Sequence, residues 1–187
     1  MLMEILFVTS NQSKFKEAEC LLEKNNIAIK QIPMILQEIQ TTEQESIVLS
    51  KAKQAFALLK KPLIVDDTCL YLEQFSNFPG TLTKQVASDL GCKGILKLVE
   101  KKSRKAYFKT LVCYVDENET KIFEGITHGN ISKQANEIKD QKMPINSIFI
   151  PKGAKKTNSE LNEKKEKFSH RIKALKKLSE YLGERIV

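Results

Sequence analysis

The chain has 187 residues, of which 41% are hydrophobic and 29% are charged, and its formal net charge is +8. This composition is typical of a globular protein in solution, and the length suffices for one domain with a proper core or for two small lobes that share a sheet. No apolar run approaches the ~18 residues of a membrane-spanning helix, and the first residues lack the basic and apolar regions of a secretory signal. We therefore expect one domain over residues 1–187, a cytoplasmic location and no membrane partner. The four cysteines have no metal-ligand spacing, so we expect reduced thiols.

The first predicted unit is a strand, a polar loop and a helix. Glu4–Thr9 is a short apolar run typical of a buried strand, and Lys14–Lys24 places its apolar residues on one helical face. A loop that leads from a strand into a helix offers backbone N–H groups and the positive end of the helix to an anion. Thr9, Asn11, Ser13 and Lys14 add side-chain donors there. The alternative is an ordinary N-cap, which Asn11 or Ser13 would satisfy without a ligand.

Two further strand and helix patterns follow. Ile27–Ile32 alternates as a second strand, and a helix is expected from about Glu45 to Lys60, after a connection that contains Glu38. Leu63–Val65 is the third apolar run, and two adjacent acids come directly after it.

Asp66 and Asp67 are therefore expected at the end of a buried strand. Paired carboxylates in that position can hold a metal ion beside a reacting phosphate, because the rigid sheet fixes the ligands. The alternative is an acidic turn, which is the commoner meaning of such a pair. The pair alone does not distinguish a metal site from an acidic turn, and the other segments of the sequence are needed for that.

The middle of the chain predicts short elements and one hairpin. The two β-rich runs 106–115 and 120–131 predict an antiparallel hairpin. Gly125 and Gly129 interrupt the second run, which indicates a bulge or a close backbone approach. Between Val65 and this hairpin we expect an extended segment at 70–72, a turn at 78–80, and helices at 81–90 and 94–100.

The C-terminal part predicts one more buried strand at 147–150, a short helix at 157–160 with capping-box spacing, and a long final helix. Ser169 is a plausible cap of that last helix, His170 falls opposite its apolar stripe, and Arg171 lies on the flank of the stripe. The stripe consists of Phe168, Ile172, Leu175, Leu178 and Leu182. Without repeats or a low-complexity linker, one unit of mixed α/β type is the most economical architecture.

Positive charge is concentrated between Lys152 and Lys177, where ten Lys or Arg residues and three Glu residues carry +7. Such a segment can bind the phosphates of a nucleic acid or of a small polyanion such as a nucleotide. The alternative is a solvated helix face. Aromatic residues do not alternate with these lysines, so a nucleic-acid partner is not expected.

These features share one explanation. Anion-binding groups occur together with acids, and Mg²⁺ is typically held by one or two carboxylates plus phosphate oxygens. The combination indicates a metal-bound polyphosphate and the attack of water on a phosphoryl group.

The chain resembles the inosine triphosphate pyrophosphatases, a family that removes aberrant purine nucleotides, from about Glu4 to Leu182. Six short motifs in the family's order carry the resemblance. They are Thr9-Ser10-Asn11-Gln12-Ser13-Lys14, Leu36-Gln37-Glu38, Val65-Asp66-Asp67-Thr68-Cys69-Leu70, Phe78-Pro79-Gly80, the Gly-x-x-x-Gly-x-Ile of 125–131, and Lys165 with Ser169-His170-Arg171.

The resemblance implies hydrolysis of ITP, dITP or XTP to the monophosphate and pyrophosphate, with Mg²⁺ as cofactor and Mn²⁺ as an alternative. It implies that Asp67 activates the water with support from Asp66, and that Glu38 and Asp67 hold the metal. The implied substrate-binding residues are Thr9, Asn11 and Lys14 at the triphosphate, Lys165 near the phosphoryl group, His170 and Arg171 at the base, and Ser169, Phe149 and Asn146. The implied fold is an elongated mixed β-sheet flanked by helices, in two lobes with the active-site cleft between them, usually as a homodimer.

One segment departs from the family pattern of Gly-aromatic-Asp-Pro-x-Phe. Here Ile145 stands for the aromatic residue and Asn146 for the acid, and only Phe149 is kept. A lost stacking contact of ~1–3 kcal/mol can redirect base choice, so we expect retained hydrolysis with an altered base preference. Two alternatives stay open: a catalytically impaired nucleotide-binding protein of the same fold, and a basic nucleic-acid-binding protein.

Overall fold

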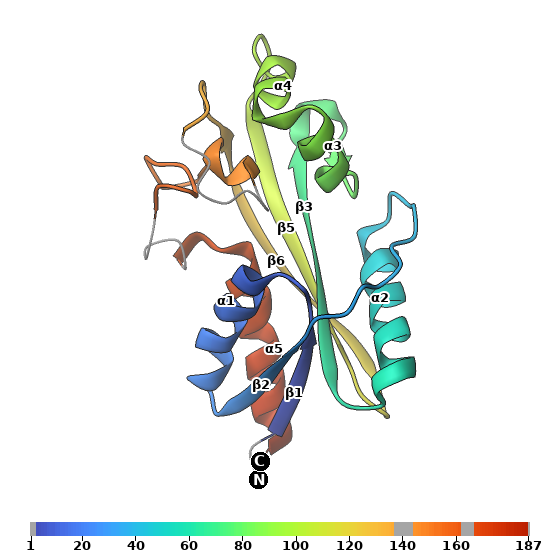
Figure 1. Ribbon diagram of the computed structural model, residues 1–187. Coiled ribbons are helices and arrows are strands. Elements are labelled where there is room, and N and C mark those ends of the chain that lie inside the picture. Colours follow the sequence, from blue (N-terminus) through green and yellow to red (C-terminus); the bar gives the residue numbers. More distant parts are fainter. Residues whose placement is uncertain (1–2, 137–143, 162–166, 187) are drawn as a thin grey trace. The chain divides into compact units, whose positions relative to one another are not determined.

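A computed structural model describes residues 3–136, 144–161 and 167–186 (Figure 1). The chain forms two compact units. The first contains the residues up to Thr68, Thr110–Gly125 and the residues from Arg171 onward, and the second contains Cys69–Lys109 and Ile126–His170. In the described ranges, no helix combines the length and the hydropathy that a bilayer crossing requires.

The fold is α/β with a mixed sheet, as predicted. The strand order is β2-β1-β3-β5-β6-β7, and β4 pairs with β3. Strands β1 and β2 are parallel, as are β1 and β3, whereas β3–β4 and β6–β7 are antiparallel. The strands are β1 Met3–Val8, β2 Ile27–Ile32, β3 Leu63–Leu72, β4 Pro79–Gly80, β5 Lys105–Val115, β6 Thr120–Ile131 and β7 Phe149–Pro151. The helices are α1 Gln12–Glu23, α2 Gln44–Leu59, α3 Thr83–Asp89, α4 Gly91–Leu98 and α5 His170–Ile186, with 3₁₀ turns η1 Glu73–Phe75 and η2 Pro144–Ser147.

In the first unit, α1 and α5 cover one face of the sheet and α2 covers the other (Figure 1). The alternation of β1 explains this arrangement, because successive strand residues point to opposite faces. Ile5 and Phe7 pack with α1 and α5, whereas Leu6 and Val8 pack with α2. The predicted stripe of the last helix is confirmed from Ile172 to Leu182, since its four aliphatic members in α5 are buried.

The second unit has its own core, which includes Leu70 and Leu72 of β3, Phe108 of β5 and residues of α4 and η2. The close backbone approach predicted at the second glycine of β6 is confirmed. A Cβ at Gly129 would overlap the carbonyl oxygen of Ile150 on β7.

The predicted end of the third strand is wrong. β3 continues without a break from Leu63 to Leu72, so Asp66 and Asp67 lie in its middle. Pairing with β1 includes Leu63 and Ile64, and pairing with β4 at Leu70 holds the far end of the strand. Within the strand, Asp66 is contacted from α1 and α5, and Asp67 is contacted from α2.

Three predictions near the C-terminus need correction. Ser147 belongs to η2, and the strand begins at Phe149. Residues 157–160 form a turn, in which the Glu160 carboxylate accepts hydrogen bonds from the backbone N–H and the hydroxyl of Thr157, both at 2.8 Å. The capping-box contact is therefore made without a helix. His170 is buried rather than on an open face, because its ring packs on an aromatic side chain.

Candidate active site

Asp66 binds two cations on the face of β3 that α1 and α5 cover. Lys14 Nζ of α1 lies 2.8 Å from its Oδ1, and Arg171 Nε of α5 lies 3.0 Å from its Oδ2. The side chain of Asp66 is only 2% exposed. Arg171 also donates to Glu17 of α1 and, from Nη2 at 3.3 Å, to the hydroxyl of Thr68. The guanidinium therefore joins two helices to the strand.

Asp67 lies on the opposite face of β3, toward α2. Lys51 Nζ is 3.7 Å from Asp67 Oδ1 and 3.3 Å from Glu38 Oε1, and it donates to the backbone oxygen of Asp66 at 3.0 Å. Gln44 Nε2 donates to Asp67 Oδ2 at 3.1 Å. Two carboxylates from distant parts of the sequence thus approach one ammonium group. We call Asp67, Glu38, Lys51 and Gln44 the Asp67 cluster.

The charges shift the pKa values of this region in ways that follow from burial and neighbours. Burial alone would raise the pKa of Asp66, but Lys14, Arg171 and Lys51 together hold it well below its ordinary value. Burial lowers the pKa of Lys14, and attraction to Asp66 does not fully offset burial and the two other cations. Burial would likewise lower the pKa of Lys51, yet its three carboxylate neighbours, Asp67 first, bring it above the ordinary value.

The loop between β1 and α1 is ordered by its own side chains. The Asn11 side chain caps α1 by accepting hydrogen bonds from the backbone N–H groups of Ser13 and Lys14 at 3.0 and 3.3 Å. The hydroxyl of Thr9 accepts from the N–H of Asn11 at 3.2 Å. The N-cap that was expected as the alternative to ligand binding is therefore present. The positive end of the helix lies at this cap, next to Lys14.

The segment that bears Glu38 is attached to α2. Gln54 forms two hydrogen bonds with the backbone of Gln37, accepting from its N–H at 2.9 Å and donating to its oxygen at 2.8 Å. Glu38 itself remains half exposed, with 51% of its side chain accessible. An open carboxylate beside a fixed backbone suits a ligand that arrives from solvent.

The second unit contains the other sequence-predicted residues that the structure describes. The His170 ring stacks on Phe108, with centroids 5.0 Å apart, and Phe149 meets Phe108 edge-on at 4.8 Å. Asn146 accepts a hydrogen bond from the Asn158 amide at 3.2 Å. Ser169 and Asn146 are buried, and Ile145 is fully buried in the core. Lys165 lies outside the described residues.

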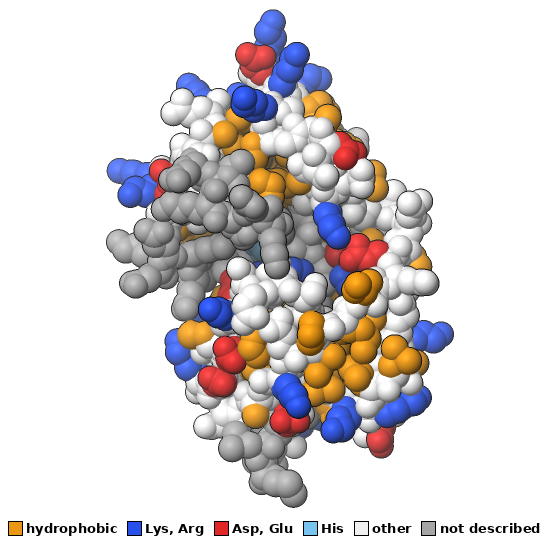
Figure 2. Space-filling model, viewed as in Figure 1, with side chains coloured by type: hydrophobic (Ala, Val, Ile, Leu, Met, Phe, Trp, Pro, Cys, Tyr) orange, Lys and Arg blue, Asp and Glu red, His pale blue; other side chains and the backbone are white. Residues whose placement is uncertain are grey.

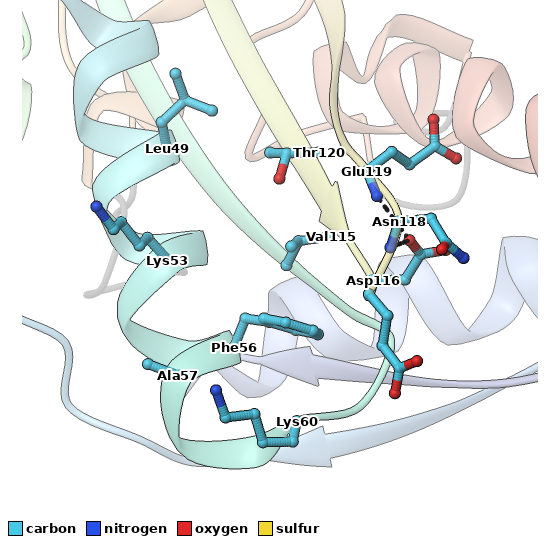
Figure 3. Close-up of a pocket in the computed structure, with 11 residues that line it drawn as sticks. Leu49, Lys53, Phe56, Ala57, Lys60, Val115, Asp116, Asn118, Glu119 and Thr120 are labelled. Carbon is cyan, nitrogen blue, oxygen red and sulfur yellow. Dashed lines mark hydrogen bonds between the residues drawn. The ribbon is translucent and has the colours of Figure 1, made fainter.

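A surface groove of about 640 Å³ lies in the first unit between α2 and the turn that joins β5 to β6 (Figure 3). Phe56 and Val115 give it an apolar floor, and Lys53 and Glu119 are among its charged edges. The turn is held by Asp116, which accepts from the N–H groups of Asn118 and Glu119 at 2.9 and 3.0 Å. The groove contains none of the residues of the Asp67 cluster.

Lys51, Gln44 and Glu17 are the site neighbours that the sequence did not reveal. Each is a polar residue of a helix whose apolar stripe was the only periodic signal. Spacing offered one clue, because Gln44 and Lys51 are seven residues apart and therefore lie on the same helix face, two turns apart.

The donor set can be tested for a metal ion. In the described part of the chain, no three or more His, Cys, Asp or Glu side chains converge as a metal site. The two carboxylates of Asp67 and Glu38 nevertheless face one cation, Lys51. Mg²⁺ commonly takes one or two protein carboxylates and completes its shell with phosphate oxygens and water. The residues present therefore fit a metal ion that is shared with a bound phosphate.

Comparisons with known proteins agree on one family. The sequence model of the Ham1 family matches residues 5–181. A dITP/XTP pyrophosphatase of Saccharolobus solfataricus is 37% identical over 177 residues, which cover 94% of this chain and 91% of the relative. An inosine triphosphate pyrophosphatase of Yarrowia lipolytica is 33% identical over 187 residues, covering 98% and 97%. The solved structure of a Ham1 protein from Coxiella burnetii has a TM-score of 0.84 at 24% identity, covers 97% of this chain and 99% of its own, and shows the same fold.

Proposed function

The chain belongs to the Ham1 family, and from that membership we propose that it is a hydrolase of aberrant purine nucleoside triphosphates. The substrates are of the ITP, dITP and XTP class, and the products are the nucleoside monophosphate and pyrophosphate. The observation that carries this proposal is the Asp67 cluster, in which the carboxylates of Asp67 and Glu38 meet the ammonium group of the largely buried Lys51.

Asp67 is assigned the role of general base. Its carboxylate takes a proton from the attacking water as the water oxygen bonds to the α-phosphorus. The bond from the α-phosphorus to the bridging oxygen breaks, and pyrophosphate leaves with the electron pair. Lys14 and Lys51 offset the negative charge that develops on the oxygens. Asp66 supports the reaction through Lys14, whose ammonium it holds at 2.8 Å.

Glu38 and Asp67 would hold Mg²⁺, with Mn²⁺ as the alternative ion. When bound there, the metal supplies positive charge to the phosphate oxygens and acidifies water. Thr9, Asn11 and Lys14 would bind the triphosphate, for which the N-terminus of α1 provides a positive end and N–H groups. Asn11 contributes by holding that helix start in place.

Base selection is assigned to Ser169, His170, Arg171, Phe149 and Asn146, with Lys165 near the phosphates. We expect an altered base preference. Ile145 is part of the core and has no ring, so it provides no stacking surface. Asn146 carries an amide where the family has an acid, so it adds donors to the site.

The test is turnover of inosine, xanthosine, standard purine and pyrimidine triphosphates with Mg²⁺, with pyrophosphate and phosphate measured separately. We expect pyrophosphate as the product, and the ranking of the rates among these triphosphates gives the base preference. Asp67→Asn should lower kcat at least ~100-fold, because it removes the base. Release of phosphate would refute the assigned cleavage point. No turnover of any nucleotide would favour the impaired nucleotide-binding alternative.

The homodimer and the cytoplasmic location belong to this proposal as well. Exposed apolar side chains of the first unit gather around α2 (Figure 2), and a second copy would remove such a surface from water. They include Ile35, Ile39, Leu49 and Leu58. Sedimentation equilibrium of the purified protein tests the dimer, and a monomer at all concentrations would refute it.

A further inference from the structure

We propose that Gln44, the first residue of α2, is a positioning residue that holds the Asp67 carboxylate in its reactive orientation. This inference rests on the proposed function. The Gln44 side chain is buried, with 3% of the residue exposed. Its Nε2 donates to Asp67 Oδ2 at 3.1 Å and also to the backbone oxygen of Asp67 at 3.2 Å. One amide therefore contacts both the side chain and the main chain of the assigned base.

The two oxygens of Asp67 are held from one helix. Gln44 binds Oδ2, and Lys51 faces Oδ1 at 3.7 Å. Both residues belong to α2 and lie two turns apart on one face, so their spacing is set by a rigid element. A carboxylate with a hydrogen bond at one oxygen and an ion pair at the other, both from one helix, has little freedom to rotate. A general base needs such a fixed orientation to meet a water in a fixed position.

The chemistry of the donor matters as much as its position. A neutral amide donates a hydrogen bond but leaves the negative charge of the carboxylate in place. A second lysine at this point would compete with a metal ion and with the incoming proton. Gln44 thus orients Asp67 while the carboxylate keeps the capacity to accept a proton and to bind a cation.

The decisive variant is Gln44→Leu, which keeps the side-chain size and removes the donor. Groups that orient a metal-binding or reacting side chain typically contribute ten- to hundredfold to activity or metal affinity. We expect kcat for the best nucleotide of the panel to fall by roughly tenfold or more, with KM within about threefold, because the role assigned to Gln44 acts through Asp67 and not on the substrate. Mn²⁺ affinity without nucleotide, measured by electron paramagnetic resonance, should weaken several-fold.

Gln85→Leu is the matched control. Gln85 of α3 makes the same kind of bond, from Nε2 to Asp89 Oδ2 at 2.7 Å, on the surface of the second unit. It should leave both kcat and Mn²⁺ affinity at the wild-type values. Gln44→Glu is the second active-site variant, because it preserves shape and replaces the donor by a carboxylate that repels Asp67. It should lower kcat more than Gln44→Leu does.

The outcomes separate this inference from the function on which it rests. Wild-type kcat and Mn²⁺ affinity in Gln44→Leu would overturn the positioning role while leaving the enzyme assignment intact, as would a rise in KM alone. If the wild type released no pyrophosphate, the proposed function would fail, and the Mn²⁺ comparison would still decide whether Gln44 orients Asp67. If thermal melting showed that Gln44→Leu does not fold, Gln44→Glu would decide, and wild-type values there would overturn the role.

Discussion

Asp66 is the residue on which the buried charges of the first unit converge. Two cations from α1 and α5 contact its two oxygens, so the strand and both helices share one network. Removing one member of a buried ion network is strongly destabilising, since it leaves the others without compensation. We predict that Asp66→Asn lowers the free energy of unfolding by about 3–5 kcal/mol near neutral pH.

The same residue predicts how stability depends on pH. Its pKa is held below the ordinary value of 3.8 in the folded protein, so below that pH the unfolded chain binds a proton that the folded chain does not. The contribution of Asp66 is therefore complete above the ordinary value and is lost as pH falls toward the lower folded value. The difference in the free energy of unfolding between wild type and Asp66→Asn, measured by urea unfolding, should be largest above pH ~5 and should shrink progressively as pH falls below ~4.

A control for this experiment is Asp89→Asn, at an exposed acid whose partner is the neutral Gln85. It should stay within about 0.5 kcal/mol of the wild type. A difference between wild type and Asp66→Asn that is constant from neutral to acid pH would contradict the role given to the ion network.

At the residue scale, the sequence identified acids better than their partners. Asp66 and Asp67 stood out as an adjacent pair, and Glu38 belonged to a recognisable motif. Lys51 gave no such signal, because a lysine in a predicted helix is commonly solvated and only tertiary packing decides which carboxylate it meets. The contact of Arg171 with Asp66 joins residues 105 positions apart, a separation across which periodicity carries no information.

At the element scale, alanine substitutions at Gly129 and Gly183 are predicted to change the free energy of unfolding in opposite directions. A Cβ at Gly129 would clash with the Ile150 carbonyl oxygen and lie 2.7 Å from Cζ of Phe149, so β6 and β7 would have to separate. A Cβ at Gly183 in α5 would meet nothing within 4 Å. Gly129→Ala should lower the free energy of unfolding by about 1–3 kcal/mol, and Gly183→Ala should raise it by about 0.5–1 kcal/mol.

Urea unfolding of the two single variants measures both effects, and each variant is the control for the other. The chemical change is identical, so a general response to added methyl groups cannot produce opposite signs. Destabilisation by Gly183→Ala, or a neutral Gly129→Ala, would show that the local spacing is not what limits these positions.

The helices and strands were predictable wherever a periodic pattern of apolar residues was bounded by capping or turn residues in the sequence. β2 and β6 have the predicted bounds, and of the two candidate caps of α1, Asn11 and Ser13, it is Asn11 that caps the helix. β3 was misjudged at the acids, because in sequence a pair of aspartates is a turn signal. In the structure, cations from two helices contact Asp66, and β4 pairs with the far end of the strand. Neither contact is visible in the local sequence.

At the scale of the whole molecule, single strands contribute side chains to two separate hydrophobic cores. In β3, Ile64 packs in the core with α1 and α5, whereas Leu70 packs in the core of the second unit. In β5, Val112 and Phe108 divide in the same way. The predicted elongation and the cleft between two lobes stay predictions, as does the single domain over residues 1–187.

The shared strands predict that the two units unfold together. If one unit unfolded alone, β3, β5 and β6 would lose the packing of one half while the other half stayed paired, and a small domain normally avoids such a partly ordered state. We expect one urea midpoint when hydrogen exchange is followed by mass spectrometry in peptides of β2 and α2, from the first unit, and of α4 and residues 144–161, from the second. Gly129→Ala, whose clash lies in the second unit, should move all four midpoints to lower urea by the same amount. Two midpoints, or a shift confined to the peptides of the second unit, would show instead that the chain consists of two independently folding domains.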